Sequence, residues 1–554
     1  MTDVGVSAPV RAYHDGTKHH FRRFARSLGY LDWASQPNPF RSFTGAAIVP
    51  LSPRPDAPSG SGRHNLQATI GDVLRHSLGL SAWKQLGPSR WSLRVNPSSG
   101  NLHPTEAYVI GDAEPGSGAA GVYHYAPDRH VLERRCAFDP ASWQAAVAEP
   151  DGWLIALTSI HWREAWKYGE RAFRYCQHDM GHAIAAIRIA VAMAGGTATL
   201  LPDWSHAEIA ALIGIDRDED FFEAEREEPG CLIAISRQSG VVSTESLVES
   251  RVVSPGVDSR VVSPGVESRV VSHEPLLAGV RAGQWTGKAS QLSEDHTSWT
   301  FIDEIAAATR DPGRDVPGRS AGSSTPSHPA PAYPARVILQ RRSAVAFDGV
   351  SAIGAAAFFS MLSRVLPPAP PFDALWWSPR IHLALFVHRV DQVAPGLYLL
   401  VRDPLAIDRL RAACGRDFLW EPASDRLPLF LLARGDGRAM ARRLSCDQDI
   451  AADGFFSLGM IADFAASLEA FGAPFYRHLF WEAGVVGQVL YLEAEAAGAR
   501  ATGIGCFFDD PVHDVLGIAD HHFQSLYHFT VGAPIEDIRL TTEPGYAWET
   551  SDQV

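Results

Sequence analysis

Three consecutive residues, Arg341-Arg342-Ser343, could bind a phosphate group. They offer two guanidinium groups and a hydroxyl at a position where the pattern predicts a helix start. Guanidinium groups bind phosphate oxygens through paired N–H donors, and the first turn of a helix adds backbone N–H groups that lack partners. The alternative interpretation is an arginine pair on a solvated surface. The motif therefore predicts a phosphate site only in combination with other binding motifs.

Two further segments could hold a flat heterocyclic ring. Pro97-Ser98-Ser99-Gly100 predicts a turn whose hydroxyls and backbone amides can hydrogen-bond the polar edge of a ring, although an ordinary turn has the same residue types. In Gly503-Ile504-Gly505 the missing side chains let the backbone approach a ring closely. The three segments together could bind a group that is anionic at one end and planar at the other.

Three other motifs give weaker signals. Residues 116–121 fit the GxGxxG pattern of dinucleotide-binding folds, but the residues that follow alternate like a strand instead of opening a helix. His178 and His182 have the spacing of metal ligands on one helix face, yet no third ligand is evident, so we predict no metal site. Cys446 could act as a nucleophile, but the sequence assigns it no base.

The elements that must position these residues occur in two similar halves. Residues 303 positions apart correspond in two apolar helices predicted over 173–195 and 476–498, with Gly181 matching Gly484. Both helices end at a glycine, a common signal at helix C-termini. A tandem copy of this kind can behave as a homodimer fused into one chain, with a pseudo-two-fold interface.

A segment of unusual composition separates the halves. SRVVSPGVD at 250–258 and SRVVSPGVE at 259–267 repeat with a nine-residue period, and Pro-rich sequence returns at 321–335. Because Pro-Gly turns oppose helices and long strands, we interpret residues 241–335 as a linker, with one helix expected near 298–310. The predicted organisation is an N-terminal extension (1–60), a first domain (61–240), this linker, a second domain (336–546) and a C-terminal tail (547–554).

Composition and charge limit the classes of function. Hydrophobic residues make up 46% of the 554 residues, and 49 Lys and Arg against 63 Asp and Glu give a net charge of −14. Such a chain is globular, and without a basic tract it is a poor candidate for binding nucleic acid. Six scattered cysteines without a CxxC pair, no apolar N-terminal segment and apolar runs too short for a bilayer predict a reduced, cytoplasmic protein that does not enter membranes.

The three binding motifs, around one predicted fold, resemble the FMN-dependent nitroreductase superfamily, and more closely its SagB-type branch, the azoline oxidases of peptide-azole biosynthesis. Residues 94–110, 166–183, 340–347 and 501–505 carry the resemblance, together with the entry segment 13–41. The resemblance covers both halves but not the repeats. It implies FMN as cofactor and an α+β fold, in which a mostly antiparallel sheet is wrapped by helices.

Members of that superfamily are usually intertwined homodimers with FMN at the subunit interface. One subunit supplies the phosphate site and the glycine loop, and its partner supplies the serine loop. The resemblance assigns the first role to Arg341, Arg342, Ser343, Gly503, Ile504 and Gly505, and the second to Pro97, Ser98, Ser99 and Gly100. Arg539 is expected to add charge near the phosphate, as a basic residue near the C-terminus does in relatives.

The two halves have lost complementary parts of this machinery. Leu200-Leu201-Pro202 stands where the first half should carry the glycine loop, and proline removes a backbone donor. Leu375-Trp376-Trp377-Ser378 stands where the second half should carry the serine loop. We therefore predict a single composite FMN site per chain, between two halves that act as an intramolecular pseudo-dimer.

The SagB-type branch also implicates a Lys-Tyr pair beside the flavin in removing the substrate proton, and Lys167-Tyr168 matches it. A partly desolvated lysine can titrate low enough to serve as a base, whereas the plainer alternative is a surface lysine next to a core tyrosine. The implied function is ping-pong dehydrogenation of a modified peptide or amide-like small molecule. Two alternatives stay open: reduction of nitroaromatics or quinones by NAD(P)H as a visiting reductant, and a flavin-free scaffold partner in peptide modification.

Overall fold

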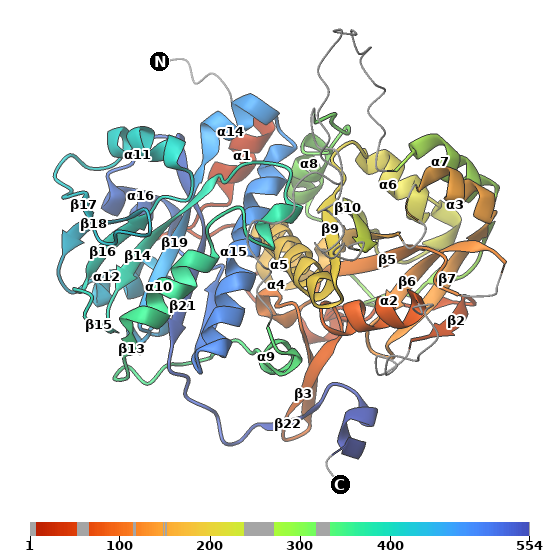
Figure 1. Cartoon of the computed structure of the whole chain (residues 1–554), viewed down its shortest axis with the longest axis horizontal. Coiled ribbons are helices and arrows are strands. Elements are labelled where there is room, and N and C mark those ends of the chain that lie inside the picture. Colours follow the sequence, from red (N-terminus) through yellow and green to blue (C-terminus); the bar gives the residue numbers. More distant parts are fainter. Residues whose placement is uncertain are drawn as a thin grey trace, which may run out of the picture.

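The computed structural model describes residues 7–51, 66–114, 118–147, 149, 152–237, 271–316 and 333–552, with the side chains described as far as residue 549. Two mostly antiparallel sheets stand on either side of a central pair of long helices, and further helices cover their outer faces (Figure 1). This arrangement is the α+β architecture expected from the sequence. The nine-residue repeats lie outside the described residues.

The two sheets have the same strand order in their shared part. The first runs β11-β7-β6-β5-β8-β10-β9 and the second β17-β18-β16-β14-β19-β21-β20. The first consists of β11 (Gln284–Trp285), β7 (Val131–Phe138), β6 (Ala120–Ala126), β5 (Thr105–Gly111), β8 (Trp153–Ser159), β10 (Glu228–Arg237) and β9 (Gly196–Leu200), with β2 (Ala47–Pro50) also on β7. The second consists of β17 (Glu421–Pro422), β18 (Leu429–Arg434), β16 (Gly396–Leu400), β14 (Ile381–Val387), β19 (Phe456–Asp463), β21 (Phe523–Gly532) and β20 (Arg500–Ile504). Their central strands β8 and β19 are buried along their whole length.

The central helices α5 (Ala172–Met193) and α15 (Phe475–Ala496) each have 22 residues and pack against each other. Nearly all their side chains are buried, including charged ones such as Asp179 and Glu482. A Cβ atom at Gly181 would lie 2.1 Å from the carbonyl oxygen of Trp481, and one at Gly484 would lie 2.2 Å from that of His178. The matched glycines therefore mark the point where the two backbones approach most closely.

The 303-residue offset recurs in the bounds of other helices. Besides α5 and α15, it relates α4 (His161–Tyr168) to α14 (Phe464–Phe471) and α6 (His206–Ile213) to α16 (Asp509–Leu516). Gly214 and Gly517, which end α6 and α16, both adopt the left-handed conformation with φ of 71° and 74°. Such a conformation favours glycine, which has no Cβ to clash.

The segment predicted as a linker contributes to the first sheet's side of the molecule. Residues 271–316 contain α7 (His273–Ala282), β11, β12 (Lys288–Ala289) and α8 (Thr300–Ala308), the last being the expected helix. Leu276 and Val280 of α7 are buried, and α7 packs on α3 (Pro140–Ala146). An amphipathic helix of this kind needs a partner for its apolar face, so residues 271–316 differ from a linker and extend the first half.

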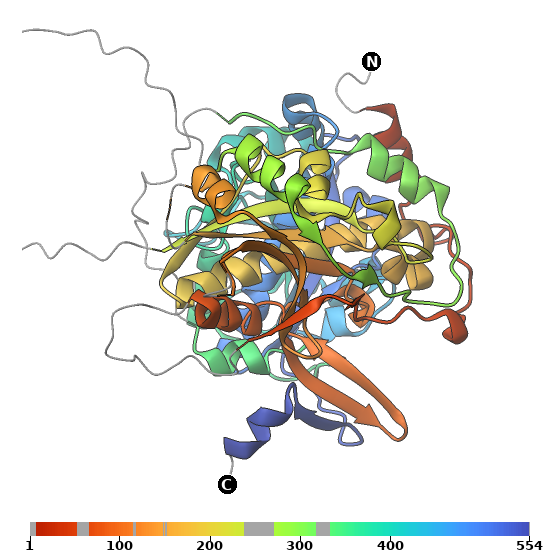
Figure 2. The same ribbon diagram turned by 90° about the vertical axis from the view of Figure 1, so that its right-hand side faces the viewer.

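Both ends of the described chain cross between the halves. Helix α1 (Ala8–Gly16) places His14 beside Tyr476 and Gln524, while Tyr13 donates to the backbone oxygen of Glu170. At the other end, β22 (Thr541–Pro544) pairs with β3 (Leu80–Leu86) of the hairpin that β3 forms with β4 (Ser89–Arg94). Figure 2 shows this C-terminal arm lying beside the projecting hairpin of the first half.

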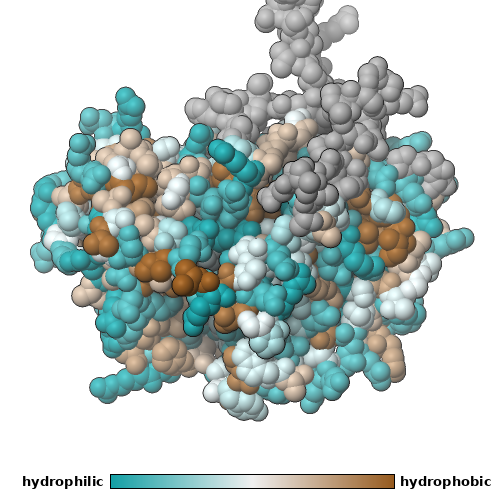
Figure 3. Space-filling model, turned by 90° about the horizontal axis from the view of Figure 1, so that it is seen from below, coloured by the Kyte–Doolittle hydropathy of each residue, from teal (hydrophilic) through white to brown (hydrophobic). Residues whose placement is uncertain are grey.

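The arm differs from the predicted division at residue 546. Glu549, expected in a separate tail, accepts hydrogen bonds from Arg75 of α2 (Leu66–Arg75), and the Tyr546 hydroxyl accepts one from Leu80 N–H. Residues 541–549 of the second half therefore pack against the first half. Seen from the side of this arm, the surface alternates between hydrophilic areas and small hydrophobic patches (Figure 3), which is ordinary for a folded chain.

Candidate functional site

A cavity of about 420 Å³ opens between the two halves. Its wall contains all three predicted binding segments, residues 97–100 from the first half and residues 341–343 and 503–505 from the second. Tyr168 also lines it. The structure thus brings segments more than 400 residues apart in the sequence to one hollow, whose volume lies in the range of small-molecule and cofactor sites.

The serine loop is anchored from below by an acid on α5. The N–H and hydroxyl of Ser99 donate to Asp179 Oδ1 at 3.1 and 3.2 Å, and the N–H of His103 donates to Ser98 Oγ at 2.7 Å. Gly100 has a φ of 61°, and a Cβ atom there would lie 2.6 Å from the Tyr168 hydroxyl and 3.2 Å from Lys167 Nζ. The glycine is therefore required both by the turn and by the close approach of the Lys-Tyr pair.

Two buried carboxyl groups lie behind this loop. Burial raises the pKa of Asp179 to about 7, against the lowering effect of its bonds from Ser98 and Ser99. Burial also raises the pKa of Glu164 well above its ordinary value, and the neighbouring Asp179 raises it further. Because two carboxylates in one desolvated space cannot both ionise, the pair holds a proton near neutral pH.

Lys167 and Tyr168 end helix α4 beside the serine loop. Burial raises the pKa of the Tyr168 phenol, and the nearby Glu164 raises it further, so this group stays protonated and acts as a donor. Its ring packs edge-on against Tyr175 at 4.6 Å. Lys167 is exposed and lies outside the cavity wall, but its Nζ reaches the loop at Gly100.

The arginine motif differs from its prediction in one respect, because it follows a helix instead of opening one. Helix α9 (Ala335–Gln340) ends before Arg341, whose N–H closes its last turn on Val337. Arg341 therefore has no N-terminal N–H groups of a helix beside it that could bind an anion. Any anion binding at this end of the cavity must come from side-chain charge.

Side-chain charge is concentrated at this end. Arg341 is buried, one of its nitrogens donates to the carbonyl of Arg94, and its Nε has no hydrogen-bond partner among the described residues. Arg342 donates to the carbonyl oxygen and hydroxyl of Ser81, and the Ser343 hydroxyl lies 2.9 Å from the Tyr491 hydroxyl. Two guanidinium groups and a hydroxyl on one cavity wall are suited to an anionic ligand.

Two further cations join the arginine pair on the cavity wall, Lys84 from the β3–β4 hairpin and Arg500 at the start of β20. Burial lowers the pKa of Arg342 to about 9, and the charges of Arg341 and Arg500 lower it further. Burial likewise lowers the pKa of Lys84, and the neighbouring Arg342 and Arg500 add to this effect. Among the described residues, Glu536 offsets part of the charge by pairing with Arg500 at 2.5 Å. A cluster of cations that depress one another's pKa is stabilised by a bound anion such as phosphate.

The glycine loop forms the opposite wall at the end of β20. The N–H of Gly503 donates to the Tyr491 hydroxyl at 2.8 Å, and the carbonyl of Gly505 accepts from the Tyr175 hydroxyl at 3.1 Å. A Cβ atom at Gly503 would lie 1.9 Å from the Tyr527 hydroxyl, and one at Gly505 would lie 2.4 Å from the Tyr175 ring. The glycines thus make room for two tyrosines, Tyr175 and Tyr527, that line the cavity.

Arg539 is not brought to the site. Its guanidinium binds the carboxylate of Asp537, two residues earlier, at 2.7 and 2.9 Å, and 73% of its side chain is exposed. Asp537 lies on the cavity wall and Arg539 does not, so the local pair brings no net positive charge to the phosphate end. Lys84 and Arg500, which the sequence did not single out, contribute charge there instead.

The corresponding position in the other half carries aromatic side chains where the first half has the serine loop. Glu482, the counterpart of Asp179, accepts hydrogen bonds from the indole of Trp377 at 3.0 Å and from the N–H groups of Arg380 and Ile381. The Trp377 ring stacks on His478 at 4.9 Å. The same acid therefore anchors the equivalent loop, but bulky rings occupy the space in front of it.

The residues that the sequence did not single out are the acids and tyrosines around the predicted motifs. They are Glu164, Tyr175, Asp179, Tyr491 and Tyr527. One signal was available for Asp179, since the offset comparison pairs it with Glu482. No such sequence signal was available for the tyrosines, because each lies in a helix or strand whose apolar pattern already explains an aromatic residue.

The weaker motifs have structural explanations in the described chain. The residues after the GxGxxG match form strand β6, not a helix. His178 stacks on Tyr527 at 4.1 Å, and His182 Nε2 lies 3.2 Å from the Tyr527 hydroxyl. Within the described ranges, no helix is long and apolar enough to cross a membrane.

Comparison with solved structures identifies proteins of similar fold. A protein from Anabaena variabilis, described provisionally as a nitroreductase, superposes with a TM-score of 0.64 over 95% of this chain and 99% of its own, at 21% identity. The microcin synthetase McbBCD complex of E. coli with truncated pro-MccB17 bound matches with a TM-score of 0.27 over 41% of this chain and 77% of that chain, at 14% identity. No family model matches the sequence, and no curated protein matches it either. The chain has the fold of the Anabaena variabilis protein, as the α+β nitroreductase-like expectation requires.

Proposed function

We propose that this chain is an FMN-dependent oxidoreductase with one composite flavin site per chain. The observation that carries the proposal is the meeting of residues 97–100, 341–343 and 503–505 on the wall of one cavity. Neither half holds all three segments. In support, the fold is that of a protein described provisionally as a nitroreductase, and the repeated offset is consistent with two halves working as an intramolecular pseudo-dimer.

The residues present fit the two ends of FMN. The cations Arg341 and Arg342, with Arg500 and Lys84, line one end of the cavity and would hold its phosphate. The serine loop and the glycine loop would hold the ring, with the tyrosines beside them. When bound, FMN supplies a two-electron acceptor that takes a hydride from one substrate and is reoxidised by a second.

The Lys-Tyr pair supports dehydrogenation of a C–H next to a heteroatom, as in a modified peptide or an amide-like small molecule. Lys167 would take the substrate proton, and the protonated Tyr168 would orient the substrate by donating a hydrogen bond. Glu164, one turn earlier on the same face of α4, and Asp179 form a buried acid pair beneath them that can hold a proton. Exclusion of water from this corner keeps the acids protonated.

A second candidate is the reduction of nitroaromatics or quinones, for which NAD(P)H would be a visiting reductant. It is favoured by the provisional description of the Anabaena variabilis protein. The two functions differ in whether a proton must be removed from carbon. They therefore differ in their need for Lys167.

The first experiment is to purify the full chain, add FMN and record the flavin spectrum before and after dithionite. We expect a yellow protein that bleaches on reduction. A colourless protein that takes up no FMN would contradict the proposal and favour a non-catalytic scaffold. Reduction by NADH and NADPH, tested in parallel, then identifies the electron donor if either bleaches the protein.

The variant Lys167→Ala separates the two reactions. We expect it to lower single-turnover dehydrogenation by about 100-fold or more, the usual contribution of a positioned base, and to change NAD(P)H-driven reduction little. The FMN spectrum of the variant serves as the control for an intact site. Equal losses in both reactions would show that Lys167 is structural and would remove the argument for proton abstraction.

A further inference from the structure

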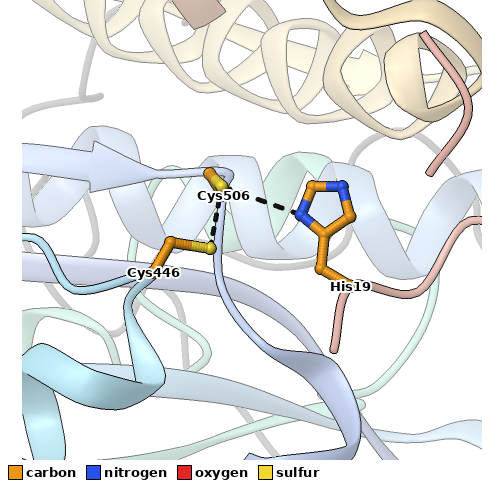
Figure 4. Close-up of side chains that lie close together, drawn as sticks. All are labelled: His19, Cys446 and Cys506. Carbon is orange, nitrogen blue, oxygen red and sulfur yellow. Dashed lines mark hydrogen bonds between the residues drawn. The ribbon is translucent and has the colours of Figure 1, made fainter. Parts of the chain in front are cut away.

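Three side chains from distant segments meet at the edge of the cavity (Figure 4). Cys446 Sγ lies 2.8 Å from Cys506 Sγ, and His19 Nδ1 lies 3.7 Å from Cys506 Sγ. Cys506 follows the glycine loop directly and lines the cavity, whereas Cys446 stands between α12 (Arg438–Leu444) and α13 (Ile450–Asp453). Nothing in the proposed flavin reaction uses these groups.

The backbone is shaped to bring the two sulfurs together. Cys446 and Asp447 both adopt the left-handed conformation, with φ of 54° and 57°, which is unfavourable for residues other than glycine. The side-chain amide of Gln448 then donates to the carbonyl oxygens of Ser445 and Cys506, at 2.8 and 3.1 Å. The amide ties the Cys446 loop to the segment that carries Cys506, so the contact is held from both sides.

Cys506 differs chemically from the buried cysteines. Burial raises the pKa of Cys136, Cys231 and Cys414, as expected for thiols in apolar surroundings. The pKa of Cys506 is instead lowered to about 5 by the hydrogen bond from Cys446, with further help from His19 and Arg171. That of Cys446 is raised, mainly by the same hydrogen bond. One thiolate beside one protonated thiol is the usual division of roles in a reactive dithiol.

The sulfur–sulfur distance does not suit a metal ion. Two cysteine ligands of a tetrahedral Zn²⁺, each about 2.3 Å from the ion, lie about 3.8 Å apart. Here they are in direct contact at 2.8 Å, and His19 is the third member of the group. A metal would have to push the sulfurs apart, whereas bond formation between them needs only a small further approach.

We propose that Cys446 and Cys506 form a redox-active dithiol on the cavity wall, which a small organic disulfide converts to a protein disulfide. The Cys506 thiolate attacks one sulfur of the small disulfide, breaking its S–S bond and releasing one thiolate. Cys446 then loses its proton and attacks Cys506 Sγ, forming the protein disulfide and releasing the second small thiolate, which takes up a proton. Two protein thiols are oxidised by two electrons, and one small disulfide is reduced to two thiols.

The test uses the full chain, reduced and desalted, with oxidised glutathione as the small disulfide. Mass spectrometry of alkylated protein is expected to show the loss of two hydrogens and a peptide that joins Cys446 to Cys506. The variant Cys446→Ser should accumulate a glutathione adduct at Cys506, because no second thiol can displace it. The variant Cys414→Ser, which removes a buried cysteine elsewhere, should form the same disulfide as the unaltered chain.

Three results would overturn the proposal. One is six free thiols after treatment that oxidises a free reference dithiol. Another is an adduct at Cys506 of the unaltered chain as persistent as that of Cys446→Ser. The third is a stoichiometric Zn²⁺ ion in the purified chain that protects both thiols until a chelator removes it. All three measurements count thiols or metal, so they do not depend on whether FMN binds.

Discussion

At the residue scale, the two halves hold equivalent loops with equivalent acids in opposite electrostatic settings. Asp179 accepts from Ser99 and lies beside a second carboxyl group, Glu164. Glu482 accepts from the 377–381 loop but is paired with the buried guanidinium of Arg402. The acid anchors a loop in both halves, and in the first half burial also raises its pKa.

The Asp179→Asn variant should flatten the dependence of stability on pH. The pKa of Asp179 in the folded chain, about 7, lies above its ordinary value of 3.8, so the native state keeps a proton that the unfolded chain releases. Stability therefore falls as pH rises through that window, by roughly 2–4 kcal/mol for this group, and the asparagine variant should lose less. Denaturant unfolding of both proteins at several pH values between about 5 and 8 measures the difference.

Glu482→Gln provides the matched control at the corresponding position. It leaves Arg402 buried without a counter-charge, so it should destabilise the chain by about 3–5 kcal/mol at every pH in the series. Equal slopes for Asp179→Asn and the unaltered chain would mean that the acid pair near the serine loop does not hold a proton in the folded state.

Arg341 is the residue whose loss should affect FMN binding most directly. Its guanidinium belongs to a buried residue on the cavity wall, and a charge-assisted hydrogen bond contributes about 1.5–3 kcal/mol, so Arg341→Gln should weaken FMN binding roughly 10- to 100-fold. Arg438→Ala is the control, because that arginine is exposed, paired with Asp436 and away from the cavity wall. Fluorescence titration of FMN measures both. An equal loss in the two variants would indicate only a change in overall charge.

At the scale of elements, the central helices illustrate what could be predicted from the sequence. The apolar runs and the 303-residue offset predict α5 and α15, their terminal glycines and the match of Gly181 with Gly484, because these features follow from local patterns. The helix start predicted at Arg341 is wrong, since α9 ends there. The structural contribution of residues 271–316 to the first half could not be predicted, because the Pro-Gly repeats beside them dominate the local composition.

Gly181→Ala should destabilise the chain by about 3 kcal/mol or more. The added methyl would meet the backbone of Trp481, which cannot move without separating the two helices. Gly415→Ala is the control, because a methyl there would make only ordinary contacts, the nearest at 3.4 Å. Thermal unfolding of both variants measures the difference, and a Gly181→Ala variant as stable as Gly415→Ala would show that the helices pack less closely than described.

At the scale of the whole molecule, the site depends on contacts between segments far apart in the chain, which cannot be predicted from a single sequence. Motif types and complementary losses predict which segments should meet, and the cavity wall contains them all. The cations Lys84 and Arg500 and the buried acids Glu164 and Asp179 could not be placed there, because their positions depend on the crossing of hairpin, arm and central helices. The crossing arms at both ends of the chain join the halves around this one cavity, while the equivalent position holds Trp377 and His478.

The central claim is one FMN site per chain, built from both halves. The direct measurement is the ratio of FMN to protein after reconstitution and removal of free flavin, with FMN released by denaturation and quantified by its absorbance. One FMN per chain is predicted, because the equivalent position carries Trp377 stacked on His478 in place of a serine loop. Two FMN per chain would show that the Trp377 side also binds, and a chain that retains none would contradict the composite site.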